Sequence, residues 1–193
     1  MPVLEKEQYN ACDCDDTGYT SQLSNKVIVV NHTMLPGEHP GQLFFCSGEG
    51  VTNPHIIDKT VFAISLSTGE HHRFGRSDVI GALKPELMPD DARMHLSQIR
   101  PSGAADFDSP DFSGYCFLED GRYCTGVWLR DAQEAVEFAA MQAPYQHRVM
   151  ICDRDDFSVM EMTGGNLAHI SQKVWDAYEQ GGAGLGRGGM SMT

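Results

Sequence analysis

Three cysteines in the first quarter of the chain have the residue type and spacing of a metal site. Cys12 and Cys14 are separated by one residue, and Cys46 follows at the end of an apolar run. Two thiolates one residue apart can both reach one ion, and tetrahedral zinc is commonly held by cysteine and histidine. The candidate zinc ligands are therefore Cys12, Cys14 and Cys46, with His32 or His55 completing the set. Because no second close pair accompanies them, the simpler interpretation is exposed thiols in an N-terminal arm.

Cys46 also allows a different chemistry, nucleophilic catalysis. A glycine-rich loop, Ser47–Gly50, follows it, and His55 lies downstream as a distant base. No local signature of a cysteine enzyme surrounds this residue, and a small buried hydrophobic side chain explains the same cysteine. The sequence therefore predicts no catalytic residue, and a small metal- or cysteine-dependent enzyme is kept as an alternative function.

Two further cysteines belong to a predicted hairpin. Tyr115–Leu118 and Arg122–Leu129 flank Asp120–Gly121, a dipeptide typical of two-residue type I′ turns. Such a turn sets Cys116 and Cys124 on opposite faces of the sheet, because side chains alternate along a strand. We therefore expect no disulfide between these two thiols.

Acidic residues are concentrated in one segment of the second half. Between Asp106 and Glu137 the chain has eight acidic side chains, opposed only by Arg122 and Arg130. A surface of that sign can attract a basic partner or imitate the phosphates of nucleic acid, and ordinary solubility charge is the plain alternative. The candidate partner-binding residues are Asp106, Asp108, Asp111, Glu119, Asp120, Glu134 and Glu137.

The composition is that of a globular, acidic protein. Hydrophobic residues make up 41% of the 193 residues and charged residues 21%, and the formal net charge is −13. This charge argues against direct binding to nucleic acid or to an anionic membrane, because phosphate binding needs a basic surface. No apolar run is long enough to span a membrane and no signal peptide is recognisable, so we expect a cytoplasmic protein whose cysteines are thiols or ligands. Zinc is the one cofactor that the residues suggest.

Periodicity and turn residues predict an α+β fold of antiparallel strands with a few short helices, in two small subdomains that each have a strands-then-helix order. The expected strands are Lys26–Met34, Leu43–Cys46, Thr60–Leu66, His71–Phe74, Tyr115–Leu118, Arg122–Leu129, Arg148–Cys152 and Phe157–Met162, and the expected helices begin near Asp78, Pro89, Asp131 and Ser171. The corresponding organisation is an irregular arm (1–25), a β-meander plus helix (26–100), a linker or long loop (101–114), a ββαββ(β)α subdomain (115–180) and a flexible glycine-rich tail (181–193). Whether the two halves share one core is left open.

Two segments carry a resemblance, His72–Arg93 (HRFGRSDVIGALKPELMPDDAR) and His147–Met162 (HRVMICDRDDFSVMEM). They resemble uncharacterised small accessory proteins of bacterial integrative and conjugative elements and phages. The resemblance implies a bacterial cytoplasm and a role in element maintenance or in countering host defence, and its motifs carry over no functional residue.

The expected function is a non-enzymatic protein that binds a protein partner, preferentially through the partner's basic surface. Regulation or inhibition of a host defence complex would be the role. A nucleic-acid mimic is the other alternative, and it predicts that the acidic side chains line one continuous face.

Overall fold

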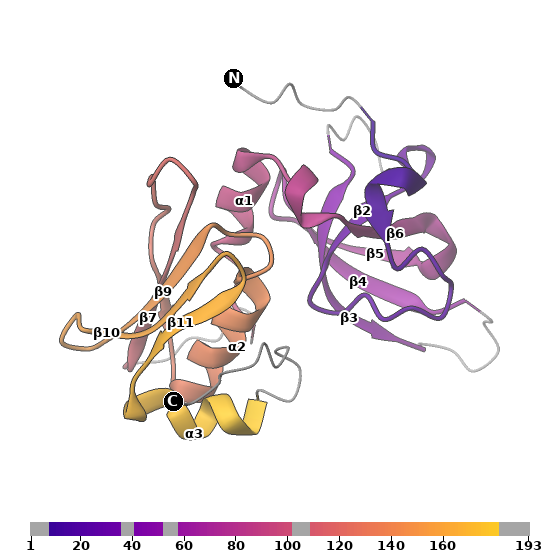
Figure 1. The fold of residues 1–193 in the computed structure, drawn as a ribbon. Helices are drawn as coiled ribbons and strands as arrows, with labels where there is room; N and C mark the ends of the chain where they lie inside the picture. The colour runs from indigo at the N-terminus through magenta and orange to yellow at the C-terminus, as the bar shows by residue number, and fades with distance from the viewer. Residues whose placement is uncertain (1–7, 36–40, 52–57, 102–108, 182–193) are drawn as a thin grey trace, which may run out of the picture. The chain divides into compact units, whose positions relative to one another are not determined.

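The computed structural model describes residues 8–35, 41–51, 58–101 and 109–181. The chain divides into two compact units, Met1–Leu96 and Ser97–Thr193 (Figure 1). Each unit contains one antiparallel sheet with short helices, which confirms the α+β fold with two strand-rich subdomains.

The first unit is built on a six-stranded sheet with the order β1-β6-β2-β3-β4-β5. Its strands are β1 (Cys14–Asp15), β2 (Val27–Val30), β3 (Leu43–Gly50), β4 (Thr60–Ser65), β5 (His71–Gly75) and β6 (Val79–Leu83). The 3-10 helix Ala11–Asp13 precedes these strands, and three more 3-10 helices (His32–Met34, Arg76–Asp78 and Pro85–Leu87) and the helix α1 (Asp90–Leu96) connect or follow them. Every pairing is antiparallel, as the succession of short strands and turn residues predicts. The helix expected to begin near Asp78 is wrong: the residues that follow, Val79–Leu83, form strand β6, which pairs with β2 in the sheet.

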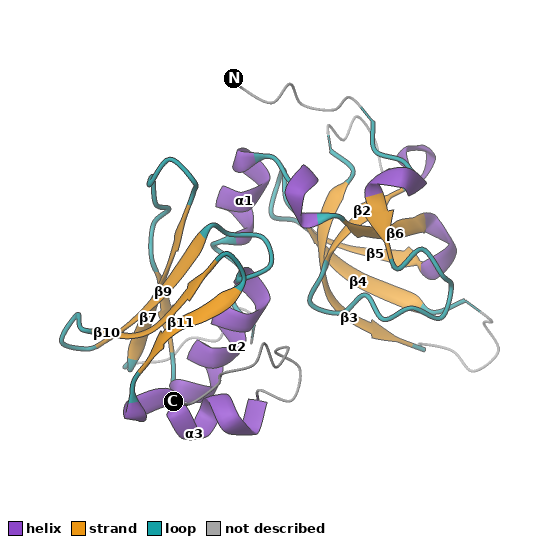
Figure 2. Cartoon of the chain, in the orientation of Figure 1, coloured by secondary structure: helices purple, strands orange, loops and turns teal. Residues whose placement is uncertain are grey.

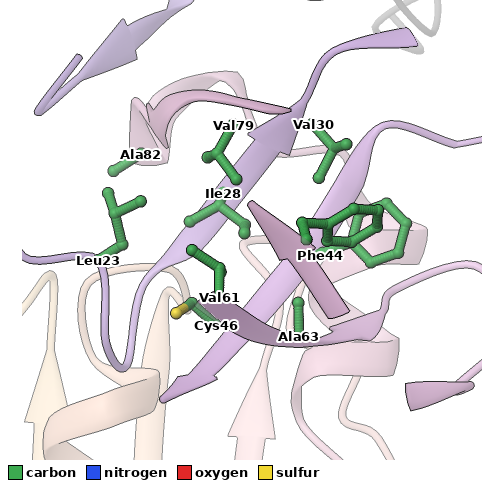
Figure 3. Close-up of a cluster of buried hydrophobic side chains, with 10 residues drawn as sticks. Leu23, Ile28, Val30, Phe44, Cys46, Val61, Ala63, Val79 and Ala82 are labelled. Atoms are coloured by element: carbon green, nitrogen blue, oxygen red, sulfur yellow. The ribbon is translucent and has the colours of Figure 1, made fainter. Parts of the chain in front are cut away.

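β-Branched and aromatic side chains form the core of this unit. All four residues of β2 are fully buried, so this strand has no solvent-facing side. Ile28 and Phe44 oppose each other across β2 and β3, and the Phe44 ring meets Phe74 edge-on at 5.0 Å between centroids. Figure 3 shows the cluster, which comprises Leu23, Ile28, Val30, Phe44, Cys46, Val61, Ala63, Phe74, Val79 and Ala82.

The N-terminal segment differs from the irregular, loosely attached arm expected for residues 1–25. In its described part, residues 8–25, β1 pairs with β6, and the side chains of Tyr9 and Leu23 are buried. The guanidinium of Arg76, which is 2% exposed, donates to the carbonyl oxygens of Asp16 (3.1 Å) and Gly18 (2.7 Å). Sequence composition missed this attachment because it uses backbone oxygens, which every residue type carries.

The second unit is built on a five-stranded sheet with the order β11-β10-β9-β7-β8. Figure 2 shows strands of this sheet in orange and its helices in purple. Its strands are β7 (Phe112–Phe117), β8 (Val127–Leu129), β9 (Arg148–Asp153), β10 (Ser158–Thr163) and β11 (Asn166–Ile170), and its helices are α2 (Ala132–Gln142) and α3 (Gln172–Gly181). β7 thus begins inside the expected linker 101–114, of which residues 102–108 lie outside the described residues. Of the expected tail 181–193, residues 182–193 lie outside the described residues.

Helix α2 covers one face of the second sheet. A Cβ added to Gly114 of β7 would lie 2.6 Å from the Phe138 ring of α2, so the helix packs closely against the strand there. The helix begins as its sequence predicts: the Asp131 carboxylate caps it by accepting from the Glu134 backbone N–H at 2.9 Å. Because side chains alternate along β7, the residues on either side of Gly114 point to the opposite face, which is called the open face below.

The hairpin that follows β7 has a different register from the expected one. Phe117 pairs with Tyr123, and the Leu118 N–H donates to the Arg122 carbonyl at 2.8 Å. The loop 119–121 therefore has three residues, with Gly121 in the left-handed region (φ +82°). A two-residue turn over Asp120–Gly121 would instead have placed Tyr123 opposite Leu118.

The prediction that Cys116 and Cys124 lie on opposite faces is consequently wrong. Cys116 precedes Phe117 and Cys124 follows Tyr123, so the pairing of Phe117 with Tyr123 sets the two cysteines opposite each other. The Cys124 N–H donates to the Cys116 carbonyl at 3.3 Å. The regular strand expected at Arg122–Leu129 is reduced to β8 (Val127–Leu129), preceded by the isolated bridge at Tyr123.

Candidate functional site

The open face of the second sheet gathers aromatic side chains that sequence reasoning did not single out. The strand register places these residues beside one another: Tyr115 of β7 opposes Met150 of β9, Phe117 opposes Arg148, and Ser113 opposes Trp128 of β8. Across the next pairing, Glu161 of β10 opposes Met150. We call Tyr115, Phe117, Tyr123, Trp128, Arg148, Met150 and Glu161 the aromatic platform.

Three rings of the platform, those of Tyr115, Phe117 and Tyr123, pack against one another in defined geometry. Tyr123 lies 5.7 Å from Phe117 and 6.4 Å from Tyr115, measured between ring centroids, and the two tyrosine rings are inclined by 73°. Edge-on arrangements of this kind are favoured by the charge distribution of aromatic rings. Gly126 lies against Tyr115, since a Cβ at this position would come within 2.5 Å of the ring. Glycine at 126 therefore lets the ring lie on the backbone.

An ion pair fixes the side of the platform formed by β9 and β10. Arg148 donates from Nε and Nη2 to the two carboxylate oxygens of Glu161, at 2.8 and 2.9 Å. The hydrogen bonds from Arg148 to Glu161 raise the pKa of the guanidinium. Its Cζ atom lies 5.1 Å from the centroid of the Phe117 ring, within cation–π range. The cation is thus held between a carboxylate and an aromatic ring.

Two platform side chains are largely exposed to solvent. The exposed fraction is 63% for Trp128 and 65% for Tyr123. Tryptophan and tyrosine dominate the binding energy of protein–protein interfaces, where they fill pockets of the partner. The Tyr123 ring already packs against the Tyr115 and Phe117 rings and so loses little conformational entropy on binding, which suits recognition.

Carboxylates flank the platform at both ends of β7 and β9. Glu119 and Asp120 lie in the loop after β7, and Asp111 precedes this strand at its other end. Asp155 and Asp156 lie in the turn that connects β9 to β10, which is at the same end as Asp111 because β9 runs antiparallel to β7. The platform thus has an apolar centre and mostly acidic ends, with Arg122 and Arg154 as the cations of these loops.

The structure disperses the acidic residues that the sequence singled out. Asp106 and Asp108 lie outside the described residues. Asp111 pairs with Arg154 at 2.5 Å, and its distance from Glu119 along the strand is about 26 Å at ~3.3 Å per residue. Asp120 accepts from Arg122, first from its backbone N–H and then from its side chain, and these hydrogen bonds lower the pKa of the Asp120 carboxyl.

The two acidic residues of α2 have separate environments. Glu134 is 3% exposed and accepts the Arg130 backbone N–H at 2.7 Å, so it belongs to the start of the helix rather than to a surface. Glu137 is exposed and accepts from Gln133 at 2.8 Å. The described acidic side chains therefore do not line the one continuous face that a nucleic-acid mimic requires.

The structure does not bring Cys12, Cys14 and Cys46 together as a metal site. Cys14 is in β1 and Cys46 in β3, and β6 and β2 lie between them, which separates the two strands by about 14 Å at ~4.8 Å per strand. Across the described ranges no group of three or more His, Cys, Asp or Glu side chains is arranged to hold a metal ion. His32 is hydrogen-bonded to Gln8 at 2.8 Å, and His55 lies outside the described residues.

Cys46 has the environment of a core residue. It is fully buried, and its thiol lies 3.5 Å from the Gly48 carbonyl oxygen, to which it donates. Burial raises the pKa of the Cys46 thiol to about 11, so the nucleophilic thiolate is scarce at neutral pH. The interpretation of Cys46 as a small buried hydrophobe therefore accounts for its surroundings.

Comparisons of the chain with protein-family models, with curated proteins and with solved structures found no match. Within the part of the chain that the structure describes, none of the helices has the length and apolar character needed to cross a membrane.

Proposed function

We propose that this chain is a non-enzymatic protein-binding protein whose aromatic platform docks onto a basic surface of a protein partner. The observation that carries the proposal is the exposure of Trp128 and Tyr123 on a face where neighbouring rings and an ion pair already fix the geometry. Exposed apolar patches commonly mark protein–protein interaction sites, because their burial against a partner removes apolar surface from water.

Charge favours a basic partner. The chain has a formal net charge of −13, and Asp111, Glu119, Asp120, Asp155 and Asp156 occupy the ends of the platform. Protein interfaces commonly have an apolar centre with aromatic residues and a polar rim, and charges of opposite sign on the two rims accelerate association. Lysine and arginine side chains of the partner would therefore lie around the platform, with apolar side chains at its centre.

The same rings could stack on unpaired nucleobases, and charge is the argument against that ligand. Proteins that bind single-stranded nucleic acid place their stacking aromatics in a positively charged groove. On this platform Arg148 is neutralised by Glu161, and the ends of the strands are acidic. A protein partner therefore fits the platform better than a nucleic acid.

The biological setting that we propose is a bacterial mobile genetic element, with this protein as an accessory factor that regulates or inhibits a host defence complex. The support is the resemblance of two segments. Residues 72–93 extend from β5 to α1, and residues 147–162 form β9 and most of β10, the two strands that supply Arg148, Met150 and Glu161 to the platform.

The test compares capture of partners by the wild-type protein and by a Tyr123→Ser/Trp128→Ser variant. Val51→Ser is the matched control, because Val51 is 64% exposed and belongs to the first unit. Proteins retained from a bacterial lysate are identified by mass spectrometry, and the affinity of the purified pair is then measured by calorimetry. We expect the double variant to lose at least tenfold in affinity, since hot-spot aromatics contribute about 2 kcal/mol or more.

The circular dichroism spectra of the three proteins serve to compare their folds. An affinity that is unchanged in the double variant, or reduced equally by Val51→Ser, would refute docking on the platform. Salt-dependent binding of single-stranded RNA or DNA to the wild-type protein, lost in the double variant, would replace the protein partner by a nucleic acid.

A further inference from the structure

The opposed pair Cys116 and Cys124 is a feature that the binding proposal does not use. Cys116 lies within β7, two residues beyond Gly114, and therefore shares the face that α2 covers. Cys124 follows the hairpin loop and is tied to Cys116 by the hydrogen bond between their backbones. The exposed fractions of the two residues are 2% and 5%, and no disulfide joins them.

Their register satisfies the geometry of a disulfide. Directly opposed residues that share a backbone hydrogen bond in an antiparallel pair have Cα atoms about 5.5 Å apart, and their side chains leave the sheet on the same side. Disulfides join Cα atoms that are about 4.4–6.8 Å apart. The separation expected from the pairing falls within this range, so a disulfide requires no rearrangement of the strands.

The other cysteine of the second unit has no such partner. Cys152 of β9 opposes Ser113 of β7, and so it lies on the open side of the sheet, away from Cys116. Cys12, Cys14 and Cys46 belong to the first unit. Within the second unit, the register therefore singles out one pair of thiols.

We propose that Cys116 and Cys124 form a reversible disulfide when the protein meets an oxidant of the small-disulfide class, such as glutathione disulfide. The Cys124 thiolate attacks one sulfur of the oxidant, which forms a mixed disulfide and releases one glutathione thiolate. The Cys116 thiolate then attacks the Cys124 sulfur and releases the second glutathione. Two protein thiols are oxidised and one disulfide is reduced to two thiols, and both protons pass to solvent or to the departing thiolates.

Cys124 is the first to react because of its place in the fold. It lies outside the named strands, between the isolated bridge at Tyr123 and β8, whereas Cys116 is held in β7 between two neighbouring strands. Burial raises the pKa of the Cys116 thiol strongly, which keeps this thiol protonated until the hairpin opens. Oxidation is therefore slow and limited by opening of the hairpin.

The disulfide would link β7 covalently to the segment that contains Tyr123, next to the pair formed by Tyr123 and Phe117. Its formation is independent of the binding proposal, because the reaction needs only the register of the hairpin. A negative result would leave the evidence for the aromatic platform unchanged.

The test treats the reduced, folded wild-type protein with glutathione disulfide, blocks the remaining thiols by alkylation and maps linked peptides by mass spectrometry without reduction. We expect a linkage between the peptides of Cys116 and Cys124, with loss of the mass of two hydrogen atoms and full reversal by dithiothreitol. Cys124→Ala should abolish the linkage, and Cys152→Ala should leave it unchanged.

Circular dichroism before and after treatment verifies that the reaction occurs in the folded protein. Glutathione adducts without an internal linkage would overturn the proposal, as would a linkage of Cys116 to Cys152. In the Cys124→Ala variant, an unlinked Cys116 that resists glutathione until urea is added would support Cys124 as the first residue to react.

Discussion

The two sheets of this protein use their faces differently. In the first sheet the central strand β2 is buried at every position, and its side chains contribute to the core on both sides. In the second sheet β7 alternates: Gly114 and Cys116 face α2, whereas Tyr115 and Phe117 belong to the aromatic platform. The comparison indicates which surface is available for recognition, because residues committed to a core cannot also contact a partner.

The two units also hold buried charges of opposite sign in the same way. In the first, Arg76 donates to the carbonyl oxygens of Asp16, Gly18 and Val79. In the second, Glu134 accepts a backbone N–H from Arg130, whose guanidinium also lies 3.9 Å from the same carboxylate. Backbone dipoles therefore solvate both charges, which ties each side chain to the conformation of a particular segment of the chain.

The largest expected effect comes from removing the buried cation of the first unit. Arg76→Met keeps most of the side-chain volume and leaves three carbonyl oxygens without their donor. We expect the free energy of unfolding to fall by about 3–5 kcal/mol, as measured by urea denaturation, because three carbonyl oxygens lose this donor and each unsatisfied buried polar group costs about 1–3 kcal/mol. Arg122→Met, at an exposed pair, should change it by about 0.5 kcal/mol or less. A loss of under about 1 kcal/mol for Arg76→Met would show that the N-terminal segment is held by other contacts.

A smaller effect is expected from overfilling the helix-covered face of the second sheet. In Gly114→Ala the new Cβ would lie 2.6 Å from the Phe138 ring, and we expect destabilisation by about 1–3 kcal/mol in the same assay. Gly48→Ala in β3 is the matched control, since no atom lies within 4 Å of its added Cβ. Equal effects of the two substitutions would contradict the close packing of α2 on β7.

The smallest expected effect is a loss of stability in acid. The hydrogen bond from Lys173 lowers the pKa of Asp153, and the hydroxyls of Tyr19 and Ser77 lower the pKa of Asp58. Because both carboxylates are favoured in the folded state, their contributions are complete above the unfolded-state pKa of about 3.9 and are lost as the pH falls below it. We expect Asp153→Asn and Asp58→Asn to be less sensitive than the wild type between neutral pH and pH 3 in thermal unfolding. An identical pH dependence in all three proteins would argue against these contacts.

The sequence predicted most strands of the two sheets where the pattern was local, but it missed β1 and placed a helix where β6 lies. The β-branched run before Asn31 became β2, and the capping residue Asp131 begins α2 as expected. The register of the β7 hairpin was not predictable in this way, because Asp120–Gly121 fits both a two-residue turn and the end of a three-residue loop. The Asp120 carboxylate decides between them in the structure by accepting the Arg122 backbone N–H.

The candidate site was predictable only in part. The net negative charge followed from composition, whereas the aromatic platform needs the register of four strands to assemble. Tyr115 and Phe117 are two residues apart and so share one face of their strand, but Trp128 and Met150 join them through pairings that no local pattern specifies. The zinc hypothesis gained no support because it relied on spacing along the chain. Cys12 and Cys14 are close in sequence, but two intervening strands separate Cys46 from Cys14 in the sheet.

The attachment of residues 8–25 has a consequence for the smallest piece of this protein that can fold. A chain shortened to begin at Lys26 would keep five of the six strands of the first sheet, yet it would lack the oxygens of Asp16 and Gly18 that solvate Arg76 and the β1 edge that covers β6. The part of the chain that the first unit needs in order to fold therefore includes residues 8–25 as well as the apolar strands. A recombination event that separates residues 8–25 from the later strands would leave the buried guanidinium of Arg76 without two of its hydrogen-bond acceptors.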